Sequence, residues 1–396
     1  MSRSSWPIVW TAFGAGVVAT IIQFSIPPIL PLLQNQHDIS YTNSGLLMSL
    51  FALTTLITAV PSGFVIQKHG VRKIGVIGLA ILLLGIVFNF FSTTFFLLII
   101  ARMIQGIGFG LISVAAPSAI GQFVDHKIMS LAMGIWSTWV PVGSLLMFFV
   151  APTIVSNFKV ETLWTIIIIL ILIVAYFYLK IIPKEIEQKA EEEIEDVSET
   201  LGKTEVKKEL KNTNIWWVAV AFASLTFSLF AFNTWIPTYL TDTTSVTLVT
   251  ASWIPSVVSL FMIGSNMYAG LFLGKFRNNI MIFIVPALVT ALLWPMFMIE
   301  QSIILYSSAI LLGLSGGFVP TIIFASAPLL AKSKETVGIA MSIIIVGENA
   351  GILIGPTIFG AVRDVTGDYI MSFWLLTFSG FITLIAAYKI WKSKVF

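Results

Sequence analysis

The segment TFFLLIIARMIQGIGFGLISVAAPSAIG (residues 94–121) holds one formal charge, Arg102, in an otherwise apolar run. Because a helix rises about 1.5 Å per residue, a run of this length spans the roughly 30 Å hydrocarbon core of a bilayer. A cation in that core is costly, so one that is kept there indicates a function or a specific structural partner. The segment therefore predicts a membrane-spanning helix with a buried arginine.

Comparable apolar runs recur along the whole chain. Hydrophobic residues make up 57% of its 396 residues, charged residues make up 10%, and the mean hydropathy is +0.96, which excludes an ordinary soluble domain. A membrane β-barrel would instead show alternating strands of about ten residues. The sequence predicts an all-α polytopic membrane protein, whose twelve transmembrane helices fall at residues 8–32, 43–66, 74–92, 94–121, 129–154, 162–182, 214–240, 247–273, 279–299, 301–331, 336–362 and 370–390.

One charged stretch, KEIEQKAEEEIEDVSETLGKTEVKKELK (residues 184–211), interrupts this pattern. It divides the chain into an N-terminal six-helix half at residues 1–182, a charged cytoplasmic linker at residues 183–213, and a C-terminal six-helix half at residues 214–396. Charges of both signs at helical spacing favour a partly helical, solvated linker over a tail that binds a partner.

The two halves repeat one another. Ala132-Met133 recurs as Ala340-Met341, and Gly143 recurs as Gly351, each 208 residues later. Similar pairs in other helices lie at nearly the same offset, so the sequence predicts a 6+6 internal repeat. Membrane proteins built from such repeats bind substrate near the bilayer midplane, between the repeats.

The positions of lysine and arginine set the expected orientation. If both termini lie inside, 19 of the 22 basic residues are on the inner side, and only Lys159 and Arg363 are outside. The positive-inside rule requires such a bias. We therefore expect a multi-pass protein of the cytoplasmic membrane with both termini in the cytoplasm. The net charge of +3 follows from the same bias, so no nucleic-acid partner is expected.

The segment GFVIQKHGVRK (residues 63–73) follows the second predicted helix. It resembles the loop pattern G-x-x-x-D-R-x-G-R-[RK] of the major facilitator superfamily of secondary transporters. The resemblance implies a cytoplasmic gate formed by Gly63, Gln67, Lys68, Gly70 and Arg72. Gln67 stands where the family has an acidic residue, which leaves a hydrogen-bonded or weakened lock. Anchoring at lipid headgroups is the alternative role for Arg72.

Two further segments resemble the same superfamily. RMIQGIGFG (residues 102–110) resembles its R-x-x-Q-G-x-G motif, and MGIWSTWVPVG (residues 133–143) resembles a relaxed form of its glycine-proline motif in helix five. The start of the second segment is also similar to the branch that contains cyanate and nitroimidazole permeases. The resemblance covers essentially the whole chain and implies the twelve-helix, two-half fold of these transporters. The full glycine-proline pair occurs at Gly355-Pro356 instead, so antiport is not implied.

Glu348 is the second charge deep inside a predicted helix. It lies about twelve residues from the helix start near Thr336, a rise of about 18 Å that places it close to the bilayer midplane. A carboxyl removed from water favours its neutral form, so Glu348 could bind and release a proton. It could instead be a structural acid that hydrogen-bonds to the other half, or bind a cationic substrate beside aromatic residues.

Arg102 has three possible roles. It could hold an anionic substrate, exchange partners with a protonatable acid, or brace helices through backbone carbonyls. The glycines that follow it explain close helix packing without any chemistry. We predict that Glu348 and Arg102 form the proton-coupling pair.

Polar and aromatic residues complete the predicted site. The resemblance implies that helices one and seven line the cavity, where Pro27 and Pro237 would let them bend. Their polar residues would contact a solute or join neighbouring helices by hydrogen bonds. Trp235 and Trp253 would shape the cavity or anchor helix ends at the membrane surface. The predicted substrate-binding residues are Gln23, Arg102, Trp136, Trp139, Asn233, Trp235, Glu348 and Asn349.

These features favour secondary active transport of a small organic solute across the cytoplasmic membrane by alternating access. Among such solutes they favour an organic anion or polar metabolite, and the transport would be coupled to protons through Glu348. No nucleotide-binding motif is present, so the energy would come from a gradient. The alternatives are a proton-driven exporter of cationic or lipophilic drugs and a membrane sensor on a transporter scaffold.

An enzyme is not expected, because one Glu and one Arg do not supply the paired acid and base, or the metal ligands, that most chemistry needs. We expect no cofactor and no metal. The expected partners are the solute, a proton or other coupling ion, and membrane lipids, with the chain acting as a monomer.

Single cysteines test the orientation, because the chain has none of its own. In intact cells treated with a membrane-impermeant maleimide, Ser198→Cys in the predicted linker should stay unlabelled, whereas Ser40→Cys should react. Labelling of Ser198→Cys after the cells are opened is the control for its reactivity. Labelling of that variant in intact cells would contradict the predicted topology.

Overall fold

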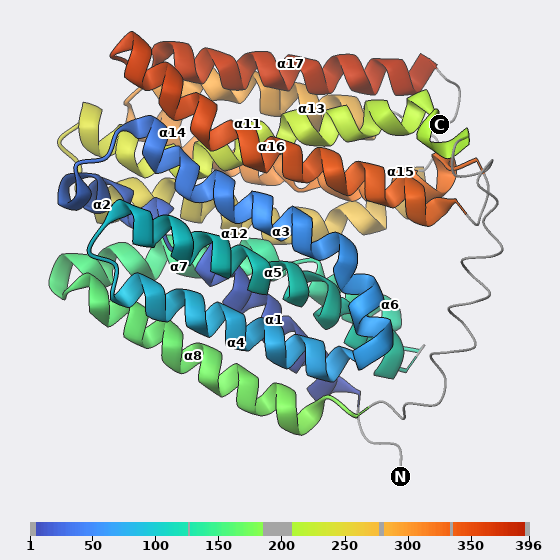
Figure 1. The fold of residues 1–396 in the computed structure, drawn as a ribbon. Helices are drawn as coiled ribbons and strands as arrows, with labels where there is room; N and C mark the ends of the chain where they lie inside the picture. Colours follow the sequence, from blue (N-terminus) through green and yellow to red (C-terminus); the bar gives the residue numbers. More distant parts are fainter. Residues whose placement is uncertain (1–4, 126, 185–207, 277–280, 333–335, 393–396) are drawn as a thin grey trace. The chain divides into compact units, whose positions relative to one another are not determined.

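Helices are the only regular elements in the part of the chain that the structure describes, which is residues 5–125, 127–184, 208–276, 281–332 and 336–392. This computed structural model is shown in Figure 1. Its elements are α1 (Trp6–Gln23), η1 (Pro27–Ile29), α2 (Leu30–His37), α3 (Tyr41–His69), α4 (Val71–Phe90), α5 (Phe95–Phe123), α6 (Met129–Trp136), α7 (Trp139–Asn157), α8 (Val160–Ile181), α11 (Thr213–Thr243), α12 (Leu248–Phe276), α13 (Met281–Leu293), η2 (Trp294–Met298), α14 (Ser302–Gly316), α15 (Phe318–Leu330), α16 (Val337–Thr366) and α17 (Ile370–Lys392).

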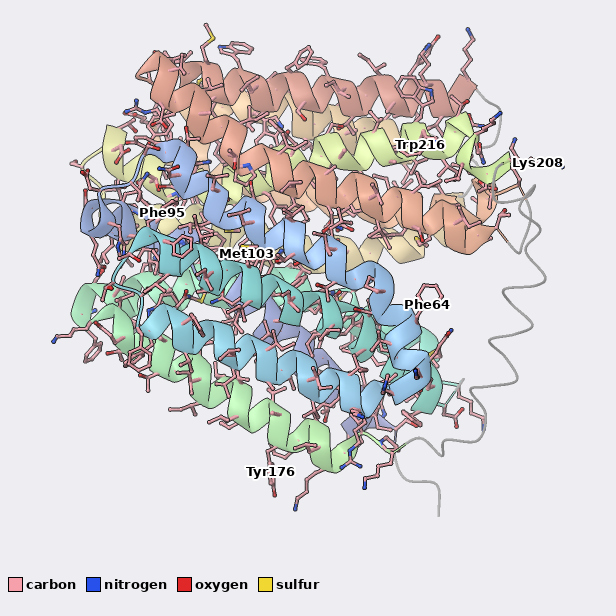
Figure 2. All side chains as sticks on the ribbon, viewed as in Figure 1. Phe64, Phe95, Met103, Tyr176, Lys208 and Trp216 are labelled. Atoms are coloured by element: carbon pink, nitrogen blue, oxygen red, sulfur yellow. The ribbon has the colours of Figure 1, made fainter. Side chains whose placement is uncertain are left out.

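Twelve stretches of the described chain are long and apolar enough to cross a membrane. The predicted all-α polytopic class with twelve spans is confirmed. Boundaries differ from the predicted ones by a few residues, as in α8, which runs over Val160–Ile181 where residues 162–182 were expected. Large apolar side chains such as Phe64 of α3 and Tyr176 of α8 point away from the ribbon (Figure 2), which suits helices that face lipid.

Several spans consist of more than one helical piece. The first joins α1, η1 and α2, the fifth joins α6 and α7, and the tenth joins α14 and α15. A proline follows each of these breaks, and because proline has no N–H, the carbonyl four residues before it loses its helical partner. The prolines responsible are Pro27, Pro141 and Pro320.

Residue contacts divide the chain into two compact units. Unit 1 is Met1–Ile186 together with Asn233–Leu260, and unit 2 is Glu187–Phe232 together with Phe261–Phe396. The predicted halves, residues 1–182 and 214–396, stay a prediction. Of the predicted linker, residues 185–207 lie outside the described residues.

In unit 1, α5 packs against α1, α3 and α4, and α4 lies between α5 and α8 (Figure 1). The approach of α5 to α3 is close enough to require glycine. A Cβ on Gly106 would lie 2.3 Å from the carbonyl oxygen of Phe51. The hydroxyl of Thr55 donates to the Gly106 carbonyl at 3.1 Å. The small residues of the R-x-x-Q-G-x-G segment therefore set the spacing between these helices.

In unit 2, α16 packs on α11 through a row of glycines. A Cβ on Gly351 would lie 2.1 Å from the carbonyl oxygen of Ala223, so the two backbones are in direct contact. The hydroxyl of Thr226 on α11 donates to the backbone oxygen of Glu348 at 2.8 Å. This packing fixes the height of Glu348 along α11. The glycines and the α11 residues that they contact are Gly347 with Ala219, Gly351 with Ala223, and Gly355 with Phe227.

Two glycines of α16 give a matched test of this packing. Gly351→Ala should destabilise the protein by about 1–3 kcal/mol, because its Cβ would overlap the α11 backbone. Gly338→Ala lies on the same helix, and its Cβ would meet nothing within 4 Å. Better helix propensity should make that control neutral or more stable by about 0.5–1 kcal/mol. The midpoint of thermal unfolding in detergent measures both, and equal midpoints would contradict the packing.

Candidate functional site

Arg102 lies fully buried on α5, and each of its N–H groups has an acceptor. Nε donates to Leu47 O at 3.0 Å. Nη1 donates to Ile22 O and to Gln105 Oε1, both at 2.9 Å. Nη2 donates to Gln23 O at 2.9 Å and contacts the sulfur of Met48 at 3.3 Å. A guanidinium has five N–H donors, so none is left for another ligand.

The end of α1 explains why an arginine is needed there. The helix ends at Gln23, and Pro27 cannot supply the N–H that would bond to the Gln23 carbonyl. Arg102 supplies that donor from α5. The end of a helix also carries partial negative charge, which favours a cation. Below the guanidinium, the Phe51 ring centroid lies 4.4 Å from Cζ. Gln105 is held in turn by its own bond to Gly85 O at 3.1 Å.

Of the three roles open for Arg102, this environment supports the brace. Its acceptors come from α1, α3 and α5 of unit 1, so the side chain joins three helices. Acting as a substrate ligand would require it to leave several of these bonds inside a medium that offers no water in exchange. Glu348, its predicted partner in proton coupling, belongs to unit 2.

A series of aromatic rings extends from Arg102. Phe51 packs on Phe109 with ring centroids 5.2 Å apart, and Phe109 packs on Trp139 at 5.4 Å. Trp139 stacks on Trp136 at 4.9 Å with an interplanar angle of 15°. Two of the predicted tryptophans, Trp136 and Trp139, are thus brought together, whereas Phe51 and Phe109 were not predicted. The spacing of Arg102, Gln105 and Phe109 along one face of α5 was the signal that could have identified Phe109.

Seven polar side-chain atoms of unit 1 are buried without a hydrogen-bond partner among the described residues. They are Thr20 Oγ1, Gln23 Oε1, both amide atoms of Asn89, Asn233 Oδ1, Thr238 Oγ1 and Ser252 Oγ. Gln23 is only 4% exposed, so its acceptor gains little from bulk water. A buried acceptor without a donor costs about 1–3 kcal/mol, and a solute hydroxyl could relieve that cost. Gln23 and Asn233 were both predicted to contact substrate.

The remaining predicted aromatic and amide residues have different surroundings. Trp235 is fully buried and lies 5.5 Å from the Tyr41 ring, which does not suit an anchor at the membrane surface. Trp253 is 44% exposed and meets Phe149 edge to face, which does suit an anchor. The amide of Asn349 donates to Ile345 O of its own helix at 3.0 Å. Asn349 therefore has a local structural partner.

Glu348 is half-buried in the middle of α16. Its carboxylate makes no hydrogen bond or ion pair with any described residue. The exposed side of α16 is marked by Val346 and Ile354. Because successive residues of a helix are about 100° apart, Glu348 points about 200° away from Val346, to the side of the packed glycines. An acid in that place, with no basic partner among the described residues, is a candidate for carrying a proton.

The predicted gate residues lie around the turn between α3 and α4. Gly70 joins the two helices with φ 83° and ψ 148°, a conformation that favours glycine. Arg72 donates from α4 to the carbonyl of Leu179 near the end of α8. Gln67 and Lys68 are exposed, and a Cβ on Gly63 would meet nothing within 4 Å. Gly70 and Arg72 therefore have structural roles in unit 1.

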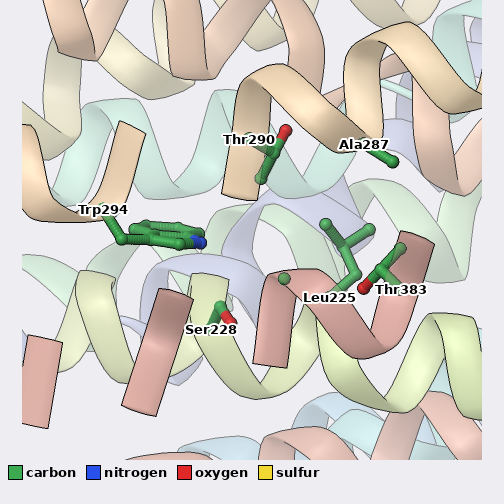
Figure 3. Close-up of a pocket in the computed structure, with 7 residues that line it drawn as sticks. Leu225, Ser228, Ala287, Thr290, Trp294 and Thr383 are labelled. Carbon is green, nitrogen blue, oxygen red and sulfur yellow. The ribbon is translucent and has the colours of Figure 1, made fainter. Parts of the chain in front are cut away.

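Unit 2 also contains a crevice lined by Leu225, Ser228, Ala287, Thr290, Trp294, Gly380 and Thr383 (Figure 3). It is too narrow to hold a water molecule. Its hydroxyls are hydrogen-bonded, as in the pairs Thr290 with Ser315 at 3.0 Å and Ser224 with Thr383 at 2.8 Å, whereas Trp294 Nε1 has no partner among the described residues. We regard this crevice as a packing feature.

Comparisons with known proteins agree with this architecture. A family model described as Major Facilitator Superfamily matches residues 12–337. The hexuronate transporter of Bacillus subtilis (strain 168) is 22% identical over 94% of this chain and 92% of its own. The predicted superfamily resemblance is confirmed, while the likeness to cyanate and nitroimidazole permeases stays a prediction.

Two solved structures share the fold. One is a bacterial homolog to the human lysosomal transporter spinster in an inward-facing and unoccupied conformation, with a TM-score of 0.78 and 14% identity over 100% of this chain and 98% of the other. The second is the D-xylose-proton symporter, with a TM-score of 0.75 and 14% identity over 98% of each chain.

The environment of Arg102 predicts that its loss damages the substrate-free protein. Arg102→Gln should cost about 3–5 kcal/mol, since the carbonyls of Ile22, Gln23 and Leu47 lose their charged donor. Arg102→Lys should not restore stability, because one ammonium cannot reach all of them. Thermal unfolding without any solute measures this, with exposed Lys180→Gln as the control. An unchanged midpoint for Arg102→Gln would show that the brace is unimportant and favour a role in binding.

Proposed function

Since the chain belongs to the Major Facilitator Superfamily, it is a membrane transporter of small solutes and not an enzyme, and we propose that it moves a hydroxyl-bearing polar metabolite of the hexuronate or sugar class together with protons. The observation that carries the proposal is Glu348, a carboxylate in the middle of α16 with no partner among the described residues. The proposed location is the cytoplasmic membrane, with both termini inside.

The side chains of unit 1 support a substrate recognised through hydroxyls. Gln23 Oε1 and Asn233 Oδ1 lack donors, and a sugar-like solute offers O–H groups. Trp139, which is half-buried and stacks on the buried Trp136, supplies an apolar aromatic ring suited to the C–H face of a sugar. Similarity to a protein named as a hexuronate transporter over nearly the full length points in the same direction.

Arg102 enters this proposal through its contacts on α1. Its bonds to the carbonyls of Ile22 and Gln23 hold the end of α1, so they also hold the Gln23 side chain in place. We assign Arg102 the positioning of Gln23 rather than direct contact with the solute. The proposed gate consists of the Gly70 turn and Arg72, joined by the exposed Gln67 and Lys68, on the proposed cytoplasmic side.

Proton coupling follows from the place of Glu348. An ionised carboxylate is costly in the membrane interior unless water or a cation reaches it. The ionised form should therefore favour a state in which Glu348 is open to water, whereas the neutral form should tolerate a closed state. Alternating access would then carry the proton and the solute in the same cycle. The similarity of fold to a D-xylose-proton symporter is compatible with symport.

Glu348→Gln tests this coupling. The variant should lose accumulation driven by a pH gradient and keep exchange at equal pH, because an amide imitates the neutral acid. Uptake and counterflow of labelled D-glucuronate and D-xylose in proteoliposomes measure the two activities. Glu161→Gln, at an exposed position in the first turn of α8, is the matched control.

Three other outcomes would each contradict proton-coupled uptake of a sugar-like solute. Normal pH-driven accumulation by Glu348→Gln would make the carboxyl structural and reject the coupling. Binding of these solutes without accumulation by the unmodified protein would favour a sensor. Outward movement of lipophilic cations, with no movement of either sugar, would favour a drug exporter.

A further inference from the structure

Glu209 lies within the stretch predicted to be a solvated linker, yet its side chain is fully buried. Both carboxylate oxygens accept hydrogen bonds. Asn212 Nδ2 donates to Oε1 at 2.7 Å. The backbone N–H of Lys332 and the hydroxyl of Thr336 each donate to Oε2 at 2.8 Å. The linker expectation is therefore wrong for this residue, because specific donors replace the water that composition alone would assign to it.

The partners of Glu209 come from three elements of unit 2. Asn212 immediately precedes α11, Lys332 follows α15, and Thr336 immediately precedes α16. The Asn212 amide also donates to the carbonyl of Leu330, the last residue of α15, at 2.9 Å. The carboxylate thus lies beside the N-termini of α11 and α16, where helix dipoles stabilise a negative charge. The buried carboxylate and these donors therefore connect the starts of α11 and α16, and we call this set of hydrogen bonds the joint.

We propose that Glu209 is a positioning residue that fixes the start of α16 to the start of α11, so that residues 208–212, the unit 2 part of α11 (residues 213–232) and Glu348 move as one rigid body. The glycine row beginning at Gly347 provides a second attachment of α16 to α11, one helix segment farther along. The glycine contacts hold the middle of α16 against α11, and the hydrogen bonds of Glu209 hold its N-terminal end. Without Glu209, the first turns of α16 before Gly347 could move relative to α11.

For Glu348, the effect of the joint on transport rests on the proposed function. If Glu348 carries the proton, its height and direction relative to α11 decide when it meets water. A looser α16 would leave solute binding in unit 1 intact and slow the step in which α16 moves. The joint itself depends only on the contacts of Glu209 and would stand without any transport role.

Spin labels on a cysteine-free chain test the joint directly. Val220→Cys on α11 and Ser342→Cys on α16 introduce cysteines at exposed positions of unit 2. Double electron–electron resonance should give one narrow distance distribution between them. Adding Glu209→Gln should broaden or shift it, because the amide NH₂ would face donors where an oxygen had accepted. Lys211→Gln, at an exposed neighbouring position, should leave the distribution unchanged.

A second variant keeps the test decisive if Glu209→Gln does not fold. Thr336→Val has nearly the same shape and removes only one donor, so it should broaden the distribution less and in the same direction. If either folded Glu209→Gln or Thr336→Val gives the distribution of the unmodified pair, the joint does not position α16 and the proposal is rejected.

Transport kinetics distinguish a positioning residue from a residue that only stabilises the fold, because positioning should change the maximal rate and leave the half-saturating concentration unchanged. In proteoliposomes, Glu209→Gln should lower the maximal rate of D-glucuronate uptake about ten-fold while leaving the half-saturating concentration unchanged, a loss within the range of coupling effects. Equal losses in rate and affinity would contradict positioning. Absence of D-glucuronate uptake by the unmodified protein would reject the proposed substrate, whereas the spin-label result would still decide the joint.

Discussion

The hydrogen bonds of Arg102 are the constraint on which unit 1 depends. In hydrocarbon no water is available to a carbonyl that has lost its helical partner, so the protein must supply another donor. Pro27 creates such a carbonyl at Gln23, and Arg102 meets it from α5. The same guanidinium bonds to Leu47 of α3, so the unwound end of α1 is fixed against two neighbouring helices. The break in α1 is possible because this cation lies beside it.

Unit 2 holds its helices by different means. There α11 and α16 are in contact at the glycines of α16, and beside Glu348 the hydroxyl of Thr226 donates to the Glu348 backbone oxygen. Close packing of that kind fixes a helix without using its charges. The carboxylate of Glu348 is thus left available, whereas the guanidinium of Arg102 is fully used. The buried guanidinium serves the fold, and the half-buried carboxylate has no partner among the described residues.

The sequence predicted what depends on local composition. Apolar runs located the twelve spans, and prolines indicated where α1 would bend. It could not identify the acceptors of Arg102, because they are mostly backbone carbonyls, and every residue type has one. For the same reason Phe51 was missed as the ring beneath the guanidinium. The charged composition around Glu209 indicated solvent, while its burial is decided by Thr336 and Lys332, which lie more than a hundred residues away in the chain.

These contrasts bear on how a charge inside a membrane protein is interpreted. Rarity alone makes Arg102 and Glu348 equally strong candidates for chemistry. The count of hydrogen bonds separates them, since a cation that has satisfied all five donors gains nothing from a substrate, and a carboxylate with no donor gains from a proton or a solute. In the proposed function, recognition in unit 1 falls to neutral groups such as Gln23 Oε1, because Arg102 bonds to the Gln23 carbonyl and has no donor left for the solute. Under that proposal, a buried arginine governs specificity through the backbone that it holds.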